Sequence, residues 1–336
     1  MTIRAISVAV LLAVAVPQAQ QNDRARALDA QIGRIFEARE YEVPRFGPAR
    51  WLPDGASYTT VERSVDQRGA SEIVRYDAKS GARTILVSAA QLTPKGRPGP
   101  LDIDDYAWSR DSRRLLVFTN TRKVWRQNTR GDYWTLDLGS GALRQLGGGA
   151  PEASLMFAKF SPDGSRAGYV RGNNLYVERI DDGHVVQLTS DGSETTINGT
   201  SDWVYEEELG VRDGFRWSPD GTKIAFWKFD TTGIGTFSLI NDTDALYPVV
   251  TKIPYPKAGT RNSAVRIGVV SADEHHATRW LDMPGDPRDT YLARMDWLDA
   301  GTVAVQQLNR LQNRNDLLLA DVRSGDVRRV FRDESK

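Results

Sequence analysis

A short turn motif recurs five times in this chain of 336 residues, at spacings of 57, 52, 57 and 80 residues. Each copy begins with an aromatic residue and continues into a tight turn of Pro, Asp, Ser or Gly, the residue types that close such turns. An apolar segment rich in β-forming residues then follows. The five copies are Trp51–Gly55, Trp108–Ser112, Phe160–Gly164, Trp217–Gly221 and Trp297–Gly301.

A second strand pair occurs in the repeats, hinged on a small-residue turn such as Ser80-Gly81, Ser140-Gly141 or Asp182-Gly183. Two hairpins make a four-stranded sheet, and sheets repeated about every 50 residues are typical of a β-propeller. We therefore predict an all-β fold, an incomplete β-propeller of about five four-stranded blades over residues 46–336. A β-sandwich with incidental turns is the alternative, and five aligned copies of the motif disfavour it.

The N-terminus has the pattern of an export signal. Met1–Arg4 carry positive charge, and Ala5–Val16 form a run of 12 small and apolar residues interrupted only by Ser7. That run is shorter than the roughly 20 residues that cross a bilayer as a helix, but it has the length of a signal-peptide core. We predict a signal peptide over residues 1–19 and a protein that is periplasmic or secreted. An uncleaved membrane anchor is the alternative.

Two further segments depart from the blade pattern. Apolar residues recur at helical spacing between Leu28 and Tyr41, which predicts a short helix within an N-terminal arm of residues 20–45. Tyr247–Gly259 contains three prolines and is predicted to form an extended, stiff connection.

A third departure is acidic. The segment from Asp202 to Gly210 predicts a two-turn helix, with Asp202 as its N-cap and Gly210 beyond its end. Glu206, Glu207 and Glu208 are consecutive, and neighbours on a helix point about 100° apart, so two of them can converge while the third diverges. Converging carboxylates attract a cation, which could be Arg, Lys, a metal or a substrate ammonium. A solvated acidic face is the alternative.

A basic segment, Arg122–Arg126, lies inside a blade at a point where the strand pattern breaks. Such a run is most often a surface feature. The planar guanidinium of arginine can also bind a carboxylate and a carbonyl oxygen together, which lysine cannot reproduce.

Composition excludes several classes of function. The 44 basic and 44 acidic side chains give zero net charge, so we expect no electrostatic attraction to nucleic acid or anionic lipid. The absence of cysteine excludes disulfides, thiolate metal sites and a cysteine nucleophile. The three histidines, His184, His275 and His276, are too few for a multi-histidine metal centre. We expect neither a metal nor a cofactor.

Several of these segments together resemble the dipeptidyl peptidase IV family of serine exopeptidases. Their order and spacing fit the family as well as the motifs do, and the resemblance covers roughly residues 28–331. The most specific of them is the tryptophan–tyrosine–triple-glutamate run. In chain order, the segments are Val124–Gln127, Tyr133–Leu138, Asp202–Glu208, Trp217–Gly221, Tyr255–Gly259 and Trp297–Arg314.

The resemblance implies an eight-bladed propeller, of which about five blades are visible here, followed by an α/β-hydrolase domain. In the family, the last two glutamates of the triplet bind the free α-amino group of the substrate, and these fall on Glu207 and Glu208. The family's arginine, here Arg126, contacts the substrate carbonyl and orders the glutamates. The implied activity is removal of Xaa-Pro or Xaa-Ala dipeptides from peptides with a free N-terminus. A homodimer like the family's is compatible with this reading.

The chain contains no Gly-x-Ser-x-Gly nucleophile elbow, so no catalytic residue is assigned. A hydrolase domain is expected beyond Lys336, as its partner within a longer enzyme. Two hypotheses follow. The chain is the substrate-binding part of an exported dipeptidyl peptidase, or it is a stand-alone secreted propeller that acts as a protein-interaction module.

Overall fold

A computed structural model describes residues 22–43, 46–273 and 277–335, and the chain divides between Gly47 and Pro48 into two compact units. In the first unit, residues 22–32 are α-helical and continue into one π-helical turn, η1 (Gly33–Glu37). The predicted N-terminal helix is therefore present, although it ends four residues before Tyr41. The predicted signal peptide, His275 and His276 lie outside the described residues.

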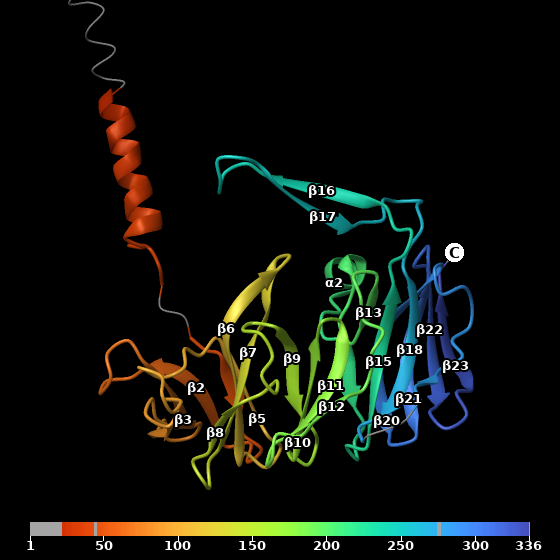
Figure 1. The fold of residues 1–336 in the computed structure, drawn as a ribbon, viewed down its shortest axis with the longest axis horizontal. Coiled ribbons are helices and arrows are strands. Elements are labelled where there is room, and N and C mark those ends of the chain that lie inside the picture. The colour runs from red at the N-terminus through yellow and green to blue at the C-terminus, as the bar shows by residue number, and fades with distance from the viewer. Residues whose placement is uncertain (1–21, 44–45, 274–276, 336) are drawn as a thin grey trace, which may run out of the picture. The chain divides into compact units, whose positions relative to one another are not determined.

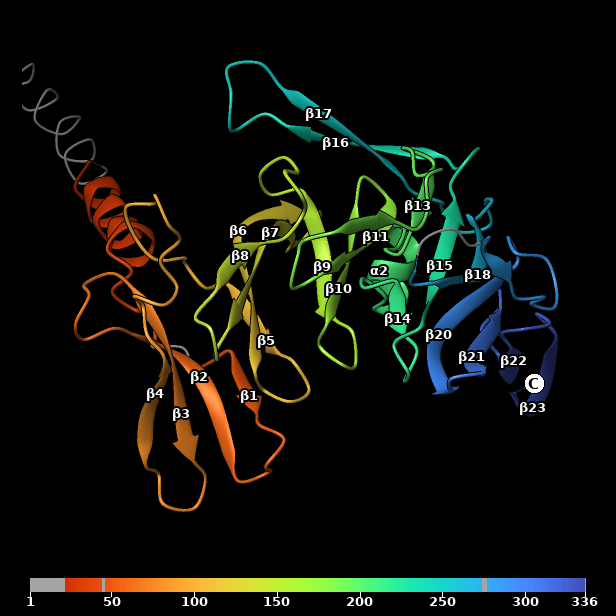
Figure 2. The same ribbon diagram turned by 60° about the horizontal axis from the view of Figure 1, so that its bottom comes forward.

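The second unit is built from antiparallel strands grouped into five consecutive blades (Figures 1 and 2). Blade 1 contains β1 (Ala49–Trp51), β2 (Ser57–Arg63), β3 (Ser71–Asp77) and β4 (Arg83–Val87). Blade 2 contains β5 (Asp105–Trp108), β6 (Arg114–Val124), β7 (Gln127–Asp137) and β8 (Leu143–Gln145). Blade 3 contains β9 (Leu155–Phe160), β10 (Arg166–Arg171), β11 (Asn174–Arg179) and β12 (Val185–Gln187).

Blade 4 contains β14 (Phe215–Trp217), β15 (Lys223–Asp230), β18 (Ala264–Ser271) and β19 (Arg279–Trp280). Blade 5 contains β20 (Thr290–Asp299), β21 (Thr302–Asn309), β22 (Arg314–Asp321) and β23 (Val327–Glu334). A short strand, β13 (Thr196–Asn198), adds to blade 4 by pairing with β15. The sheets do not close into a ring within the described residues, so the predicted incomplete propeller of five blades is confirmed.

The repeated turn motif connects the first two strands of each blade. In four blades the aromatic residue of the motif is the last residue of the first strand, and in blade 5 Trp297 lies two residues before the end of β20. The Asp of the turn then accepts hydrogen bonds from a nearby hydroxyl and from backbone N–H groups, as Asp220 does from Ser218 Oγ and Thr222 N. The motif therefore sets where each blade begins.

Blades 2 and 3 are joined, which the repeat pattern does not predict. The long strand β7 continues past its own blade, and Arg130 and Gly131 pair with Met156 and Leu155 of β9. The two blades therefore form one eight-stranded sheet. The cause is the length of the β6–β7 hairpin, whose strands have 11 residues each.

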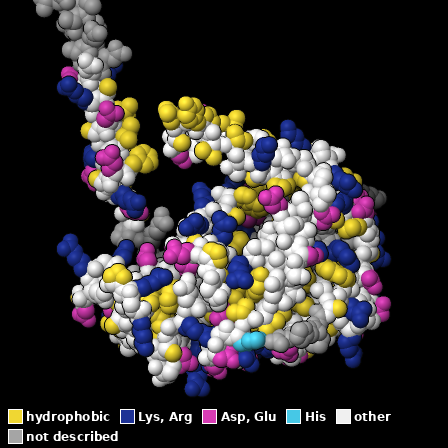
Figure 3. Space-filling model, viewed as in Figure 1, with side chains coloured by type: hydrophobic (Ala, Val, Ile, Leu, Met, Phe, Trp, Pro, Cys, Tyr) yellow, Lys and Arg dark blue, Asp and Glu magenta, His cyan; other side chains and the backbone are white. Residues whose placement is uncertain are grey.

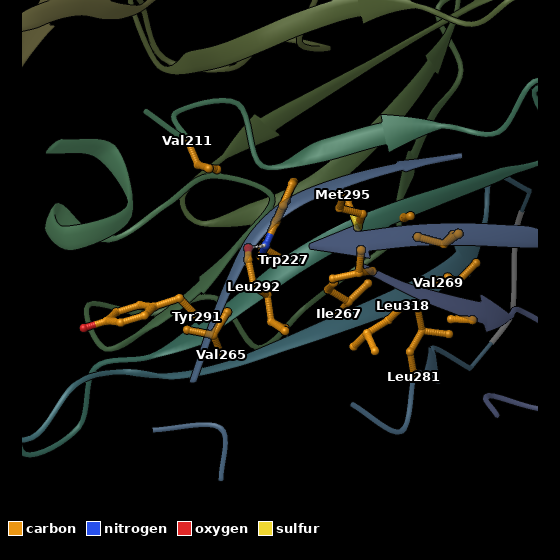
Figure 4. Packing of buried hydrophobic residues seen from close by; sticks show 14 of the residues in the cluster. Val211, Trp227, Val265, Ile267, Val269, Leu281, Tyr291, Leu292, Met295 and Leu318 are labelled. Atoms are coloured by element: carbon orange, nitrogen blue, oxygen red, sulfur yellow. Dashed lines mark hydrogen bonds between the residues drawn. The ribbon is translucent and has the colours of Figure 1, made fainter. Parts of the chain in front are cut away.

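The hydrophobic core is divided into four clusters, each lying between two successive blades. The largest lies between blades 4 and 5, and Figure 4 shows its packing around Trp227 and Leu292. The Trp227 indole N–H donates to the Leu292 carbonyl at 2.8 Å across the two blades. Each blade is thus stabilised mainly by the face of its neighbour.

A hairpin projects from blade 4, made of β16 (Thr236–Asn241) and β17 (Val249–Pro254). The predicted extended connection over Tyr247–Gly259 is correct in its extended backbone but incomplete, because its first half pairs with β16. Almost every residue of the two strands is exposed. Among the described residues, no helix is long and apolar enough to cross a membrane.

Candidate functional site

The acidic segment forms the helix α2 (Trp203–Leu209), capped as its sequence predicts. The Asp202 carboxylate accepts the Tyr205 N–H at 2.9 Å, and Gly210 ends the helix with a left-handed backbone (φ 65°). Both caps form hydrogen bonds with backbone groups that would otherwise have no partner at the ends of this seven-residue helix. In Figure 1, α2 and the tip of the β6–β7 hairpin lie at the same end of the blades.

Buried hydrogen bonds fix α2 on blades 4 and 5. The hydroxyl of Tyr205, a buried residue, accepts the Leu292 N–H of β20 at 2.8 Å. The Ser263 hydroxyl, next to β18, donates to the second oxygen of Asp202 at 2.6 Å. Burial raises the pKa of Asp202, with Ser263 opposing that shift. The direction in which the three glutamates point is therefore set by the blade framework.

Glu206 faces inward and is paired. Its side chain is 5% exposed, and Oε1 lies 3.3 Å from Arg212 Nε. Burial raises the pKa of Glu206, and the Arg212 guanidinium offsets part of that shift. Arg212, three positions beyond the end of the helix, compensates the charge of Glu206. Glu206 is therefore the member of the triplet whose charge is paired within the protein.

Glu207 contacts the arginine that the resemblance singled out. Its Oε2 lies 3.1 Å from Nε of Arg126, at the tip of the β6–β7 hairpin. The Glu207 side chain is only 14% exposed, and its other oxygen, Oε1, is buried without a hydrogen-bond partner among the described residues. A buried carboxylate oxygen is costly to leave unpaired, so it is well suited to accept a hydrogen bond from a ligand.

Glu208 points away from this pair. It is exposed and lines a cavity of about 670 Å³ together with Trp203, Tyr255, Tyr291 and Arg310. Within the described part of the chain, its carboxylate forms no ion pair or hydrogen bond. The structure thus brings Arg126 and Glu207 together and leaves Glu208 on an adjacent surface, so the roles assigned to these three residues stay predictions.

A second, smaller cavity of about 230 Å³ lies on the other side of Trp203. Its walls include Trp125, Phe157, Glu206 and Arg212. Sequence reasoning missed Arg212 and Ser263, the partners of Glu206 and Asp202. The only local sequence feature that indicates Arg212 as a partner is its position, one turn past an acidic helix. Ser263 is 61 residues from Asp202, and no sequence feature relates the two.

The described residues contain no group of three or more His, Asp or Glu side chains placed to hold a metal ion. The described histidine, His184, lies in the turn before β12.

Comparison with known proteins extends over most of the chain. The sequence profile described as "Dipeptidyl peptidase IV (DPP IV) N-terminal region" matches residues 109–336. The chain is 30% identical to a probable dipeptidyl-aminopeptidase B of Chaetomium globosum over 82% of its own length and 31% of the relative's. It is 31% identical to dipeptidyl aminopeptidase B of Saccharomyces cerevisiae, over 86% of this chain and 34% of that protein.

Among solved structures, dipeptidyl peptidase 4 of Porphyromonas gingivalis superposes with a TM-score of 0.77 at 31% identity. That match covers 87% of this chain and 40% of the other. The chain therefore spans about a third of the length of the curated relatives it matches.

Proposed function

The chain belongs to the family of the dipeptidyl peptidase IV N-terminal region, and we propose that it is the substrate-binding propeller of a serine peptidase that removes Xaa-Pro or Xaa-Ala dipeptides. In this proposal Glu207 and Glu208 bind the free α-amino group of the peptide, and Arg126 contacts the first carbonyl. The nucleophile is supplied by an α/β-hydrolase domain of the longer enzyme.

The observation that carries the proposal is the asymmetric state of Glu207. One carboxylate oxygen is 3.1 Å from Arg126, and the other is buried without a partner among the described residues. An ammonium group offers three donors and a positive charge, which a partly buried carboxylate accepts in strong, charge-assisted hydrogen bonds.

Binding the amine at a fixed point also explains dipeptide release. A peptide whose terminal ammonium is held at Glu207 presents its second peptide bond at a constant distance from the anchor. A nucleophile placed at that distance cuts after two residues. An acetylated N-terminus has neither the charge nor the three donors, so it is not recognised.

Export is part of the proposal and depends on the apolar run Ala5–Val16. Expression of the complete chain in a Gram-negative host tests it. The expected result is a periplasmic product that begins near residue 20. A full-length product in the cytoplasmic fraction would contradict export.

We also propose that the propeller self-associates through the β16–β17 hairpin. A two-stranded sheet has little stability by itself in water, and this one exposes Phe237, Leu239, Ile240 and Val250. Figure 3 shows hydrophobic side chains gathered at the free end of the hairpin. Ile240→Asp should shift a dimer to monomer in analytical ultracentrifugation, whereas a wild-type monomer at micromolar concentration would contradict the proposal.

The test of the anchor uses a polypeptide in which this propeller is joined to a hydrolase domain of the same family. We expect Glu207→Gln to lower kcat/KM for Ala-Pro amides by about 30-fold or more, the usual result of removing one member of a partly buried charge pair. Glu152→Gln, an exposed carboxylate outside the site, is the matched control. Equal rates on free and N-acetylated substrates would show that no amine is recognised.

A further inference from the structure

The tip of the β6–β7 hairpin has a backbone conformation that its sequence does not favour. Val124 pairs with Gln127, which leaves Trp125 and Arg126 as a two-residue turn. Trp125 has a φ of 52°, in the left-handed region, whereas Arg126 does not. Turns with positive φ only at the first central residue strongly prefer glycine there, because a side chain is strained in that conformation. A tryptophan at this position therefore needs compensation from its surroundings.

The Trp125 side chain is the group that can supply this compensation. Although Trp125 is at a hairpin tip, it is only partly exposed, and it lines the 230 Å³ cavity beside α2. Phe157 and Trp203 line the same cavity, and Phe157 also has a left-handed backbone (φ 55°). Two strained aromatic residues on one cavity are unusual, and such strain persists where the surrounding structure holds it in place.

The hairpin ladder is also irregular on the way to its tip. Its ladder has register shifts between Thr119 and Arg122 and between Arg122 and Lys123. Asn120, inside the first of these, has a φ of 49° and donates from its amide to Asp132 at 2.8 Å. Bulges of this kind redirect a strand and re-aim its side chains.

Arg126 itself has little else to hold it. Its side chain is 75% exposed, and its recorded contact among the described residues is the ion pair with Glu207. Ion pairs with one highly exposed member are weak, because water screens them and ordering a long side chain costs entropy. The position of Arg126 over Glu207 must therefore come from the backbone that carries it.

We infer that Trp125 is a positioning residue: its indole, on the wall of the cavity beside α2, holds the strained hairpin tip so that Arg126 stays on Glu207. The inference rests on the proposed amine anchor for its functional meaning, but the positioning itself is a property of the free protein. Loss of the indole should release Arg126, and loss of the backbone strain alone should not.

Three variants of the full chain separate these effects. Trp125→Ala removes the indole and keeps a side chain at positive φ, Trp125→Gly removes both, and Trp125→Phe keeps an aromatic ring. The ligand-free readout is the Nε–H NMR signal of Arg126, assigned by its disappearance in Arg126→Lys. We expect a signal shifted from the free-arginine position in the wild type and in Trp125→Phe, and a signal at the free-arginine position in Trp125→Ala and Trp125→Gly.

Thermal unfolding tests the strain. Trp125→Gly should have a Tm higher than Trp125→Ala by about 1 to 4 °C, because glycine accepts positive φ without penalty. The matched control is Ser112→Gly, since Ser112 also has positive φ (56°) and occupies the place that glycine takes in the four other copies of the turn motif. That variant should raise the Tm without changing the Arg126 signal.

Peptide binding then connects the positioning to function. We expect Trp125→Ala to weaken binding of Ala-Pro amide by about 3- to 10-fold, the effect of ordering one long side chain, with no change for the N-acetylated peptide. A shifted Arg126 signal in Trp125→Ala, or a signal at the free-arginine position in the wild type, would overturn the inference. A wild type that binds both peptides equally would overturn the amine anchor while the NMR result still decides the role of Trp125.

Discussion

The carboxylates of the repeated turns and those of helix α2 are in opposite electrostatic states. In the turns, donation from Ser57, Ser109 and Ser218 holds the pKa values of their aspartates below the usual range, and that of Asp220 falls to about 2. On and beside α2, burial raises the pKa values of Asp202 and Glu206. These three of the five turn aspartates are Asp54, Asp111 and Asp220.

The difference in pKa shift distinguishes carboxylates that stabilise the turns from carboxylates at the candidate site. The carboxylates of Asp111 and Asp220 accept hydrogen bonds from groups two residues away, so each stabilises one local conformation of the turn. Asp202 and Glu206 are held in an environment that does not favour their charge. Glu207 keeps one buried oxygen without a hydrogen-bond partner among the described residues. Charge that the fold leaves incompletely compensated is available to a ligand.

The largest expected effect comes from the packing between blades, which both regions require. Trp227 is 1% exposed in the cluster between blades 4 and 5 and donates to the Leu292 carbonyl. Trp227→Ala should reduce the free energy of unfolding by about 3–5 kcal/mol, since it leaves a large cavity. Urea denaturation measures this loss, and a change below about 1 kcal/mol would show that the inter-blade core is not the main stabilising contact.

A smaller effect is expected from the polar contacts that link successive turns. Arg166 donates to the Gly221 carbonyl of the next turn at 2.7 Å and contacts Asp273 at 3.0 Å. Arg166→Ala should cost about 1–3 kcal/mol, the range for hydrogen bonds of a charged group. Lys223 has the equivalent place in the next repeat, but among the described residues its ammonium group donates a hydrogen bond only to Thr222. Lys223→Ala is therefore the control and should change stability by about 0.5 kcal/mol or less.

The turn aspartates predict a loss of stability in acid. Because the pKa of Asp220 is about 2 in the folded protein and near 4 when unfolded, its stabilising effect is present above pH 4 and disappears as the pH falls towards 2. Asp220→Asn should therefore destabilise the protein at pH 6 and have a diminishing effect towards pH 2. Denaturation midpoints of the two proteins across this range measure the difference, and parallel curves would contradict it.

Glu206 should change the pH dependence of stability in the opposite direction to Asp220. Its effect should be the smallest, because Arg212 offsets part of the pKa shift that burial causes. Its pKa is higher folded than unfolded, so the folded protein binds the proton more tightly and loses stability as the pH rises from about 4.5 through the folded pKa. Glu206→Gln should flatten that slope. If the wild type instead gained stability from Glu206 over this interval, the ion pair with Arg212 would outweigh burial.

The sequence predicts the blades well because their signals are local. Each turn motif combines an aromatic strand end with residues that close a turn, and both caps of α2 lie within the segment itself. Contacts between distant residues carry no such signal: Arg126 and Glu207 are 81 positions apart, and only the family resemblance related them. Trp125 was not predicted because its residue type contradicts its backbone conformation.

The β16 strand was also missed, since its residues are almost all exposed and show no alternation of buried and exposed positions. The orientation of Glu208 could not be derived either. Helical geometry states only that two of three consecutive glutamates can converge, and tertiary contacts decide which. Here Arg212 forms an ion pair with Glu206, and Arg126 forms one with Glu207.

The central claim is that Glu207 accepts the ammonium of a peptide N-terminus, and an NMR titration of this chain tests it directly. The side-chain carboxyl carbon of Glu207, assigned by its loss in Glu207→Gln, is followed during addition of Ala-Pro amide and of its N-acetyl form. The account predicts a saturable shift with the free amine and none with the acetylated peptide. Identical behaviour of the Glu207 signal with the two peptides would contradict it.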